Sequence, residues 1–383
     1  MERIEQLLGQ FEEIVGSPAR QLDRYVEQGK KVIGCFPYYV PEELVHAAGM
    51  VPMGIWGASG TVSAAKEYFP PFYCTIAQMG LELALNGELK SLSGVIIPSM
   101  CDTLRPLTQN FRTAVPEIPM IFLAHPQNRQ PEYGVEYCRS QYQSIKAELE
   151  KIAGTTISDD RIRESIRIYN RSREARRRFI KLSGQHPEVI TPIQRSAVLK
   201  SAYFVTKEEH TNLLDELNGL LHGLPAGDWN GIRIVTSGIL ADSKDLLQIL
   251  ADYQLAVVAD DVAQESRSFR VDAAESGDPV TALARQFGMQ NDDPLLYDPK
   301  IDTRPDHVVR LVKQSGADGV VILMMQFCDP EEMEYPSLKK ALDKAGIPSV
   351  LIGCDQQMRD FARARTQIQA FFDMLKCRKN PSL

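Results

Sequence analysis

Cys328 stands where a strand-like stretch gives way to a helix. Residues 320–327 form a nearly continuous apolar run, which is typical of a buried strand. Pro330 cannot continue a strand but suits the first turn of a helix, and the glutamates that follow it would face the positive end of the helix dipole. The sequence therefore predicts that Cys328 lies at the carboxyl end of a strand, where open α/β sheets bind ligands.

Two further cysteines have similar positions. Cys101 follows the apolar run 95–100 and precedes a plausible helix start, and Cys74 separates an aromatic, proline-rich cluster from the helical stretch 75–85. If the carboxyl ends of the strands in both halves of the chain face a shared cleft, the three sulfurs can converge there. We expect this convergence.

Three thiolates on three separate loops suit an iron–sulfur cluster held between domains. Helix amino ends would stabilise both the thiolates and an anionic cluster. Zinc also accepts thiolates, but a structural zinc site usually recruits a fourth protein ligand. The alternative to any metal site is that the cysteines are small buried apolar residues.

The remaining four cysteines are assigned mainly to packing or to the surface; they are Cys35, Cys138, Cys354 and Cys377. Cys354 also ends a predicted strand and is the reserve ligand. The chain contains no CxxC pair, which excludes zinc ribbons and compact ferredoxin-type clusters.

The elements that would position these residues alternate between strands and helices. Helices are predicted over residues 1–30, 41–49, 75–85, 131–182, 242–253, 273–287, 306–315, 331–345 and 361–375, and strands over 31–36, 50–56, 95–100, 119–124, 232–236, 255–259, 320–327 and 349–352. This pattern predicts an α/β protein with two domains, mostly parallel sheets covered by helices, and an N-terminal helical segment. A break at 183–192 divides the chain into domains 1–185 and 186–383, with the cluster in the cleft between them.

The whole-chain properties are those of a globular protein. The chain has 383 residues and a net charge of −7, which argues against nucleic acid as a partner. No apolar run is long enough to span a bilayer, and the acidic amphipathic start does not resemble a secretory signal. We therefore expect a cytoplasmic protein without membrane contact.

Three other polar features each allow two interpretations. His125 with the polar residues 127–129 lines a pocket or belongs to a structured loop. The basic run in residues 171–181 is a solvated helix face or docks an acidic or phosphorylated partner. Residues 260–267, rich in acidic side chains, do acid–base or interface work or simply cap helices.

An ordered set of motifs resembles a known family. The segments are GCFPYYVPEELVHAAGMVPMGIWG (34–57), YCTIAQ (73–78), PSMCDTL (98–104), HPQNR (125–129), GILADSKDLL (238–247), ADDVAQESRSFR (259–270) and MMQFCDPEEMEYP (324–336). Over nearly its whole length the chain resembles the 2-hydroxyacyl-CoA dehydratase family, which also contains benzoyl-CoA reductase subunits. It is most similar to the dehydratase β subunits of the 2-hydroxyglutaryl-, 2-hydroxyisocaproyl- and phenyllactyl-CoA type.

The resemblance implies a cofactor, a site and partners. In the family each subunit holds a [4Fe-4S] cluster through three cysteines between two Rossmann-like domains, and the matching positions here are Cys74, Cys101 and Cys328. A homologous α subunit forms the other half of a heterodimer and binds most of the acyl-CoA substrate, and an ATP-dependent iron–sulfur activator protein delivers an electron. The β subunit is then an electron relay and half of the heterodimer.

The resemblance also implies radical chemistry. One electron added to the thioester carbonyl gives a ketyl radical anion that expels the 2-hydroxyl group. The resulting enoxy radical has a much more acidic β-proton; after that proton is lost and the electron returns, a 2-enoyl-CoA leaves. The catalytic residues beyond the cluster ligands are not assigned, and the fourth ligand is Gln326, another side chain or an inorganic group.

Two other functions are consistent with the same residues. One is a subunit of a benzoyl-CoA-reductase-like or other low-potential small-molecule reductase. The other is a cluster-free binding or assembly protein on the same fold.

Overall fold

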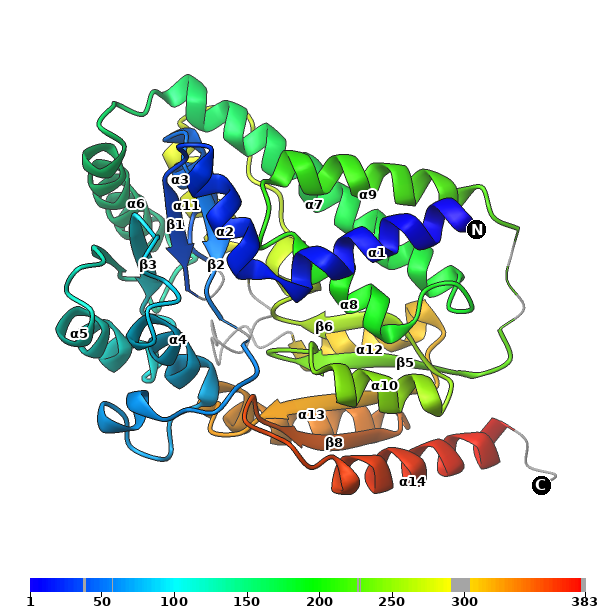
Figure 1. The fold of residues 1–383 in the computed structure, drawn as a ribbon. Coiled ribbons are helices and arrows are strands. Elements are labelled where there is room, and N and C mark those ends of the chain that lie inside the picture. The colour runs from blue at the N-terminus through cyan, green and yellow to red at the C-terminus, as the bar shows by residue number, and fades with distance from the viewer. Residues whose placement is uncertain (37–38, 57, 226, 228, 291–303, 380–383) are drawn as a thin grey trace.

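The computed structural model describes residues 1–383 except 37–38, 57, 226, 228, 291–303 and 380–383. It contains two four-stranded sheets, ordered β2-β1-β3-β4 and β6-β5-β7-β8, and all pairings between strands are parallel (Figure 1). The first sheet comprises β1 (Val32–Cys35), β2 (Val51–Gly54), β3 (Gly94–Pro98) and β4 (Met120–Leu123). The second comprises β5 (Ile232–Gly238), β6 (Leu255–Val262), β7 (Gly319–Met325) and β8 (Ser349–Cys354). The predicted α/β class with two Rossmann-like, parallel-sheet units is confirmed.

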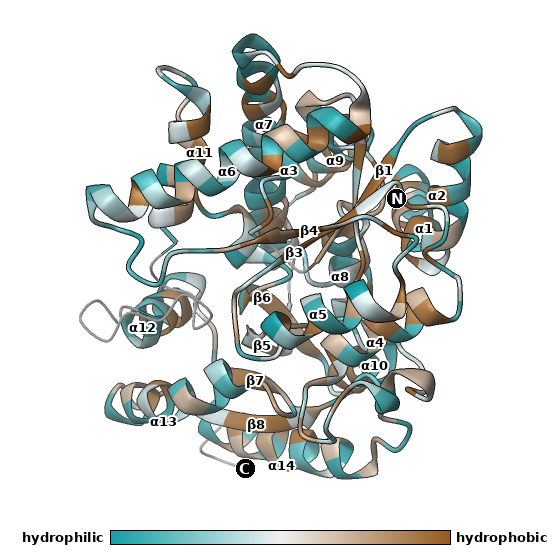
Figure 2. Ribbon diagram, turned by 90° about the vertical axis from the view of Figure 1, so that its left-hand side faces the viewer, coloured by the Kyte–Doolittle hydropathy of each residue, from teal (hydrophilic) through white to brown (hydrophobic). Residues whose placement is uncertain are grey.

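Fourteen α-helices surround these sheets in the described part of the chain. They are α1 (Glu2–Gly16), α2 (Pro18–Glu27), α3 (Glu42–Ala47), α4 (Thr75–Leu85), α5 (Leu104–Ala114), α6 (Glu132–Ala153), α7 (Asp159–Gln185), α8 (Pro192–Ser201), α9 (Lys207–His222), α10 (Lys244–Asp252), α11 (Pro279–Gly288), α12 (Arg304–Ser315), α13 (Asp329–Lys344) and α14 (Ala362–Lys379). Figure 2 shows the apolar strands inside and the hydrophilic helix faces outside. None of the described helices combines the length and apolar character needed to span a lipid bilayer.

The strands are buried on both faces, as parallel strands covered by helices must be. Every residue of β1, β3, β6 and β7 is buried. Cys35 at the end of β1 pairs in register with Gly54 and Ile96, so the carboxyl ends of these strands meet at one edge. At the same edge of the second sheet, Met325 pairs with Cys354.

The N-terminal helix packs away from both sheets. Its buried side chains join apolar residues of α7, α8 and α9 in a separate cluster; those of α1 are Ile4, Leu7, Leu8 and Phe11. These positions lie on one face of a helix, which is why the sequence pattern predicted the segment. The predicted division into domains 1–185 and 186–383 stays a prediction.

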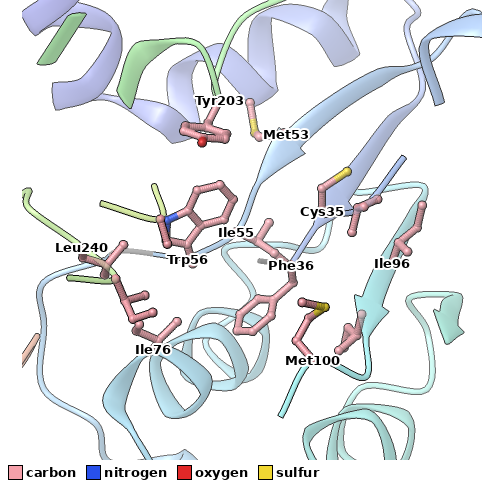
Figure 3. Packing of buried hydrophobic residues seen from close by; sticks show 14 of the residues in the cluster. Cys35, Phe36, Met53, Ile55, Trp56, Ile76, Ile96, Met100, Tyr203 and Leu240 are labelled. Carbon is pink, nitrogen blue, oxygen red and sulfur yellow. The ribbon is translucent and has the colours of Figure 1, made fainter. Parts of the chain in front are cut away.

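Trp56 follows β2 and connects side chains from distant parts of the chain. Its ring contacts Tyr203 edge-on, with centroids 4.5 Å apart. Figure 3 shows it beside Leu240, which follows β5 of the second sheet, and near Ile76 of α4. A single buried aromatic side chain therefore helps to hold the two sheets' carboxyl edges together.

The structure differs from the sequence prediction between residues 131 and 192. The predicted long helical region is two helices, because α6 ends at Gly154 in a left-handed conformation with φ 76°. The predicted break over 183–192 begins a few residues later than expected, since α7 continues to Gln185 and α8 starts at Pro192. A Cβ on Gly184 would lie 2.5 Å from the carbonyl oxygen of Val258, so this glycine permits close packing of α7 on β6 rather than ending the helix.

Two smaller differences lie in the second half. The helix predicted from residue 273 begins at Pro279, because the Asp278 side chain accepts a hydrogen bond from the Thr281 N–H and caps the helix there. The Asp- and Pro-rich loop predicted over 290–303 falls almost entirely outside the described residues.

The basic run of α7 is only partly a solvated face. Arg171, Arg178 and Lys181 are exposed, and Arg177 is half-buried and pairs with Asp272 at 2.8 Å. Arg173 and Arg176 are buried. The solvated-face interpretation is therefore wrong for these two arginines, whose surroundings come from segments far away in the sequence.

The close approach at Gly184 gives a test of the fold. We expect Gly184→Ala to lower the free energy of unfolding by about 1–3 kcal/mol, because the added methyl group would overlap the backbone of β6. Gly219→Ala in α9 is the matched control, since nothing lies within 4 Å of its Cβ position. There the substitution should be neutral or stabilise by up to about 1 kcal/mol. Equal effects in chemical denaturation would contradict the packing of α7 on β6.

Candidate functional site

All three predicted ligand cysteines lie at helix amino ends. Cys74 is the N-cap residue of α4, and Cys328 is the N-cap residue of α13. Cys101 lies just beyond β3 and three residues before α5. Among the described residues all three are free thiols; Cys328 is buried and the other two are half-buried.

The strand before Cys328 ends earlier than predicted. β7 stops at Met325, and Phe327 takes a left-handed conformation with φ 61°. The Phe327 N–H donates to the Glu332 carboxylate at 3.0 Å, and the Cys328 N–H donates to the Met325 carbonyl at 3.1 Å. The chain leaves the sheet at this strained turn, and Cys328 follows directly as the first residue of the helix terminus.

The three thiols affect one another electrostatically although they come from two different sheets. The pKa of the Cys74 thiol is raised to about 12, mainly by burial and in smaller part by Cys101. Burial also raises the pKa of Cys328 well above its ordinary value, with added contributions from Glu331, Cys74 and Cys101. The sulfurs of both halves therefore share one electrostatic neighbourhood.

Backbone N–H groups oppose this rise at each sulfur. Hydrogen bonds from Ala77 and Ile76 lower the pKa of Cys74. Burial also raises the pKa of Cys101, and the backbone N–H groups of Leu104 and Thr103 lower it. The backbone N–H of Glu331 lowers the pKa of Cys328, in opposition to the effect of the Glu331 carboxylate. Helix amino ends thus point donors at all three sulfurs, as an anionic sulfur centre requires.

The chemistry of the donor set suits an iron–sulfur cluster. The three cysteine thiols each receive backbone N–H donors, which favour the thiolate form that such clusters bind. Among the described residues, no group of three or more His, Cys, Asp or Glu side chains could hold one metal ion.

Thr75 connects Cys74 to the second sheet, a role that the sequence did not indicate. Its hydroxyl lies 3.7 Å from the Met325 sulfur and accepts a hydrogen bond from the Gln356 N–H at 3.2 Å. Met325 ends β7 and Gln356 follows β8. The residue next to one predicted ligand is therefore fixed by the strand ends that lead to another.

The other cysteines differ in burial and surroundings. Cys354 is buried at the end of β8, and burial together with Glu331, Asp242 and Asp355 raises its pKa. Cys35 and Cys138 are buried, and Cys377 is exposed. Gln326 is also exposed, and its N–H donates to the Cys354 carbonyl at 3.0 Å.

His125 belongs to a packed loop. Its ring stacks on Phe287 with centroids 4.2 Å apart, and burial lowers its pKa to about 3. Nearby, the buried Arg129 donates to the Gln290 carbonyl at 3.1 Å. Of the two interpretations for residues 125–129, the structured loop agrees with this packing.

The acidic segment after β6 forms a buried ion network beside the cysteine site. Asp261 is fully buried and accepts from Arg304 at 2.8 Å and from Arg270 at 2.8 Å. Arg267 contacts both Asp261 and Glu331, and Glu331 lies in the first turn of the helix that begins at Cys328. The network therefore ties β6 and α12 to the helix that carries the third cysteine.

A second set of buried pairs extends this network. Arg195 of α8 bridges Asp260 and Glu265, and Arg304 also pairs with Glu334. Asp260, Asp261 and Glu265 are thus ion-pair partners rather than free acid–base groups. Sequence reasoning missed Arg195, Arg304 and Glu334, because nothing in their local sequence indicates partners 30 to 70 residues away.

The charge on Asp261 should be essential for stability. We expect Asp261→Asn to cost about 3–5 kcal/mol, because it leaves buried arginines without their shared counterion. Asp252→Asn, which removes an exposed pair with Arg365, is the control and should cost far less, because solvent screens exposed ion pairs. Chemical denaturation of both variants measures the difference, and similar losses would disprove the role of the network.

The pH dependence of the same group has a definite sign. Burial opposes ionisation of Asp261, but Arg267, Arg304 and Arg270 hold its pKa well below the ordinary value. A depressed carboxyl pKa stabilises the fold above the unfolded pKa of about 4 and loses that contribution as the pH falls below it. Wild-type protein should therefore lose this stabilisation only in acid, and Asp261→Asn should lack that acid-sensitive part.

Comparisons with known proteins identify the family. The model described as 2-hydroxyglutaryl-CoA dehydratase, D-component, matches residues 37–375. The chain is 52% identical to the beta subunit of (R)-2-hydroxyglutaryl-CoA dehydratase from Acidaminococcus fermentans, over 97% of this chain and 100% of the relative. It is 43% identical to the (R)-phenyllactyl-CoA dehydratase beta subunit of Clostridium sporogenes, over 98% of this chain and 100% of the relative. Identity to a benzoyl-CoA reductase subunit of Thauera aromatica is 25%, over 96% of each chain.

The family match covers all three cysteine-bearing helix ends and every strand of the two sheets except β1, so the predicted relationship is confirmed. The chain belongs to the 2-hydroxyglutaryl-CoA dehydratase D-component family, a family of hydro-lyase subunits.

Proposed function

We propose that this chain is the iron–sulfur β subunit of an (R)-2-hydroxyacyl-CoA dehydratase and holds a [4Fe-4S] cluster through Cys74, Cys101 and Cys328. The observation that carries the proposal is that Cys74 and Cys101, from the first half of the chain, raise the pKa of Cys328 in the second half, while all three thiols receive backbone N–H donors. When bound, such a cluster supplies a one-electron carrier. The chain itself supplies ligands, burial and a defined electrostatic field.

Acidic neighbours give that field a negative sign. Asp329 raises the pKa of Cys74 and Cys101, and Glu331 raises the pKa of Cys328, in addition to the effect of burial. A negative field that disfavours a thiolate also disfavours an added electron. We therefore expect a low reduction potential at this site, only partly offset by the N–H donors.

The proposed enzyme is a heterodimer with a homologous α subunit that binds most of the acyl-CoA substrate. The names of two relatives as beta subunits support a partner chain. In the proposed reaction, one electron from an ATP-dependent activator protein enters the thioester carbonyl. The ketyl radical anion expels the 2-hydroxyl group, and the enoxy radical that forms loses its β-proton. The radical anion that remains then gives the electron back and becomes the 2-enoyl-CoA.

A reductase of the benzoyl-CoA type is the second candidate. The 25% identity to a benzoyl-CoA reductase subunit supports it, since that match also spans nearly the whole chain. Identities of 52% and 43% to dehydratase beta subunits favour dehydration.

Replacing the proposed ligands should deplete iron. After anaerobic purification, we expect Cys74→Ser, Cys101→Ser and Cys328→Ser each to lose most of the bound iron and sulfide, and with them the electron paramagnetic resonance signal of the reduced protein. Cys377→Ser is the matched control, because this thiol is exposed and is not a predicted ligand. The iron content of this variant should equal that of wild type. An iron content equal to that of wild type in all three variants would contradict the site assignment. A wild-type protein that contains no iron would favour the cluster-free alternative.

Substrate class separates the two enzymatic candidates. The protein purified with its partner chain and supplied with the activator and ATP should convert an (R)-2-hydroxyacyl-CoA to the 2-enoyl-CoA, detected by mass spectrometry. It should leave benzoyl-CoA unreduced under the same conditions. Reduction of benzoyl-CoA without dehydration of the hydroxyacyl thioester would replace the proposed function by the second candidate.

A further inference from the structure

Among the residues that the structure describes, Arg176 of α7 is a buried cation without an acidic partner. The residue is 4% exposed, and its Nε donates to the Ser172 carbonyl within the same helix at 3.3 Å. Its guanidinium lies over the Phe269 ring, 4.5 Å from the centroid. No ion pair forms between Arg176 and any described carboxylate.

The neighbouring cations differ from Arg176 in this respect. Arg173, one helical turn away, pairs with Glu43 in a buried contact. Lys207 pairs with Glu42 at 2.7 Å and also donates to the Ala202 carbonyl. Glu42 and Glu43, the two described carboxylates that lie here, are therefore already paired with other cations.

All five of these charged side chains line one cavity, about 80 Å³ in volume. Glu42 and Glu43 come from the start of α3, the two arginines from α7, and Lys207 from the start of α9. The cavity holds about five to eight times the volume that one water molecule needs. It therefore has room for a ligand of a few heavy atoms.

The walls of this cavity combine aromatic side chains with a net positive charge. Tyr169, Tyr203 and Phe287 line it, and among the described lining residues three cations face two carboxylates. Burial lowers the pKa of Arg176 to about 10, with Arg173 adding to the effect, yet the guanidinium stays protonated near neutral pH. A buried charge that lacks a counterion is costly, and a bound anion would offset the cost.

We propose that this cavity is a binding site for a small carboxylate of about the size of acetate, held by the guanidinium of Arg176. The planar fork of a guanidinium matches a carboxylate in a bidentate geometry, which favours this class over spherical halides. A single negative charge balances the excess of one cation. The site is independent of the three cysteines, because none of them lines the cavity.

The test measures anion binding to the protein as it purifies anaerobically. In titration calorimetry at constant ionic strength, acetate should bind wild type, and thermal melting should shift upward with acetate concentration. Arg176→Gln should weaken acetate binding by at least about tenfold and abolish the melting shift, because it removes the charge-assisted hydrogen bonds. Arg178→Gln is the matched control, since this arginine lies on the same helix but is exposed, and it should bind acetate as wild type does.

A second variant guards against a folding defect. Arg176→Lys keeps the charge without the planar fork, so it should retain a weaker response to acetate. Chloride or phosphate that binds as well as acetate would overturn the carboxylate assignment. Equal acetate binding by wild type and Arg176→Gln, or none by wild type, would overturn the site.

Discussion

The structure depends on two parallel sheets that direct their carboxyl ends toward each other. Parallel strands align their ends, so each sheet contributes a row of strand-to-helix junctions to one shared edge. Cys101 lies in the junction after β3 of the first sheet, and Cys328 lies in the junction after β7 of the second. Cys74 precedes α4, and Thr75 of this helix contacts residues at the ends of β7 and β8. Opposing effects meet there, because burial and acidic neighbours keep the thiols protonated while helix N–H groups favour thiolates. A metal centre would resolve this opposition by replacing the protons.

The buried ion network explains how the second half can hold Cys328 rigidly. Arg267 and Arg304 join Asp261 at the end of β6 to acidic residues of α13, so the helix that begins at Cys328 is fixed from two other elements. Buried ion pairs contribute little net stability, but removing one member is costly. Such a network therefore specifies one arrangement of β6, α12 and α13 more than it stabilises the fold as a whole.

Much of the fold and the position of each site cysteine followed from local sequence signals. Short apolar runs marked the strands, and Pro330 marked the helix start after Cys328. What local signals missed depends on distant partners. Gly184 resembles a helix breaker but permits close packing on Val258, and Phe327 ends β7 early through a bond to Glu332. Arg173 and Arg176 resemble surface charges, yet segments from other parts of the chain bury them.

The two halves of the chain are also interleaved in a way that serves a shared centre. Helix α11 from the second half packs on α6 from the first, and Trp56 contacts Tyr203 beyond α8. If the halves met only at the cysteines, any rotation between them would separate Cys328 from the other two sulfurs. Because Thr75 contacts both Met325 and Gln356 next to Cys74, such a rotation must first break contacts beside the sulfurs themselves. Packing beside Cys74 and packing remote from it therefore fix the two halves relative to each other, as the proposed cluster site requires.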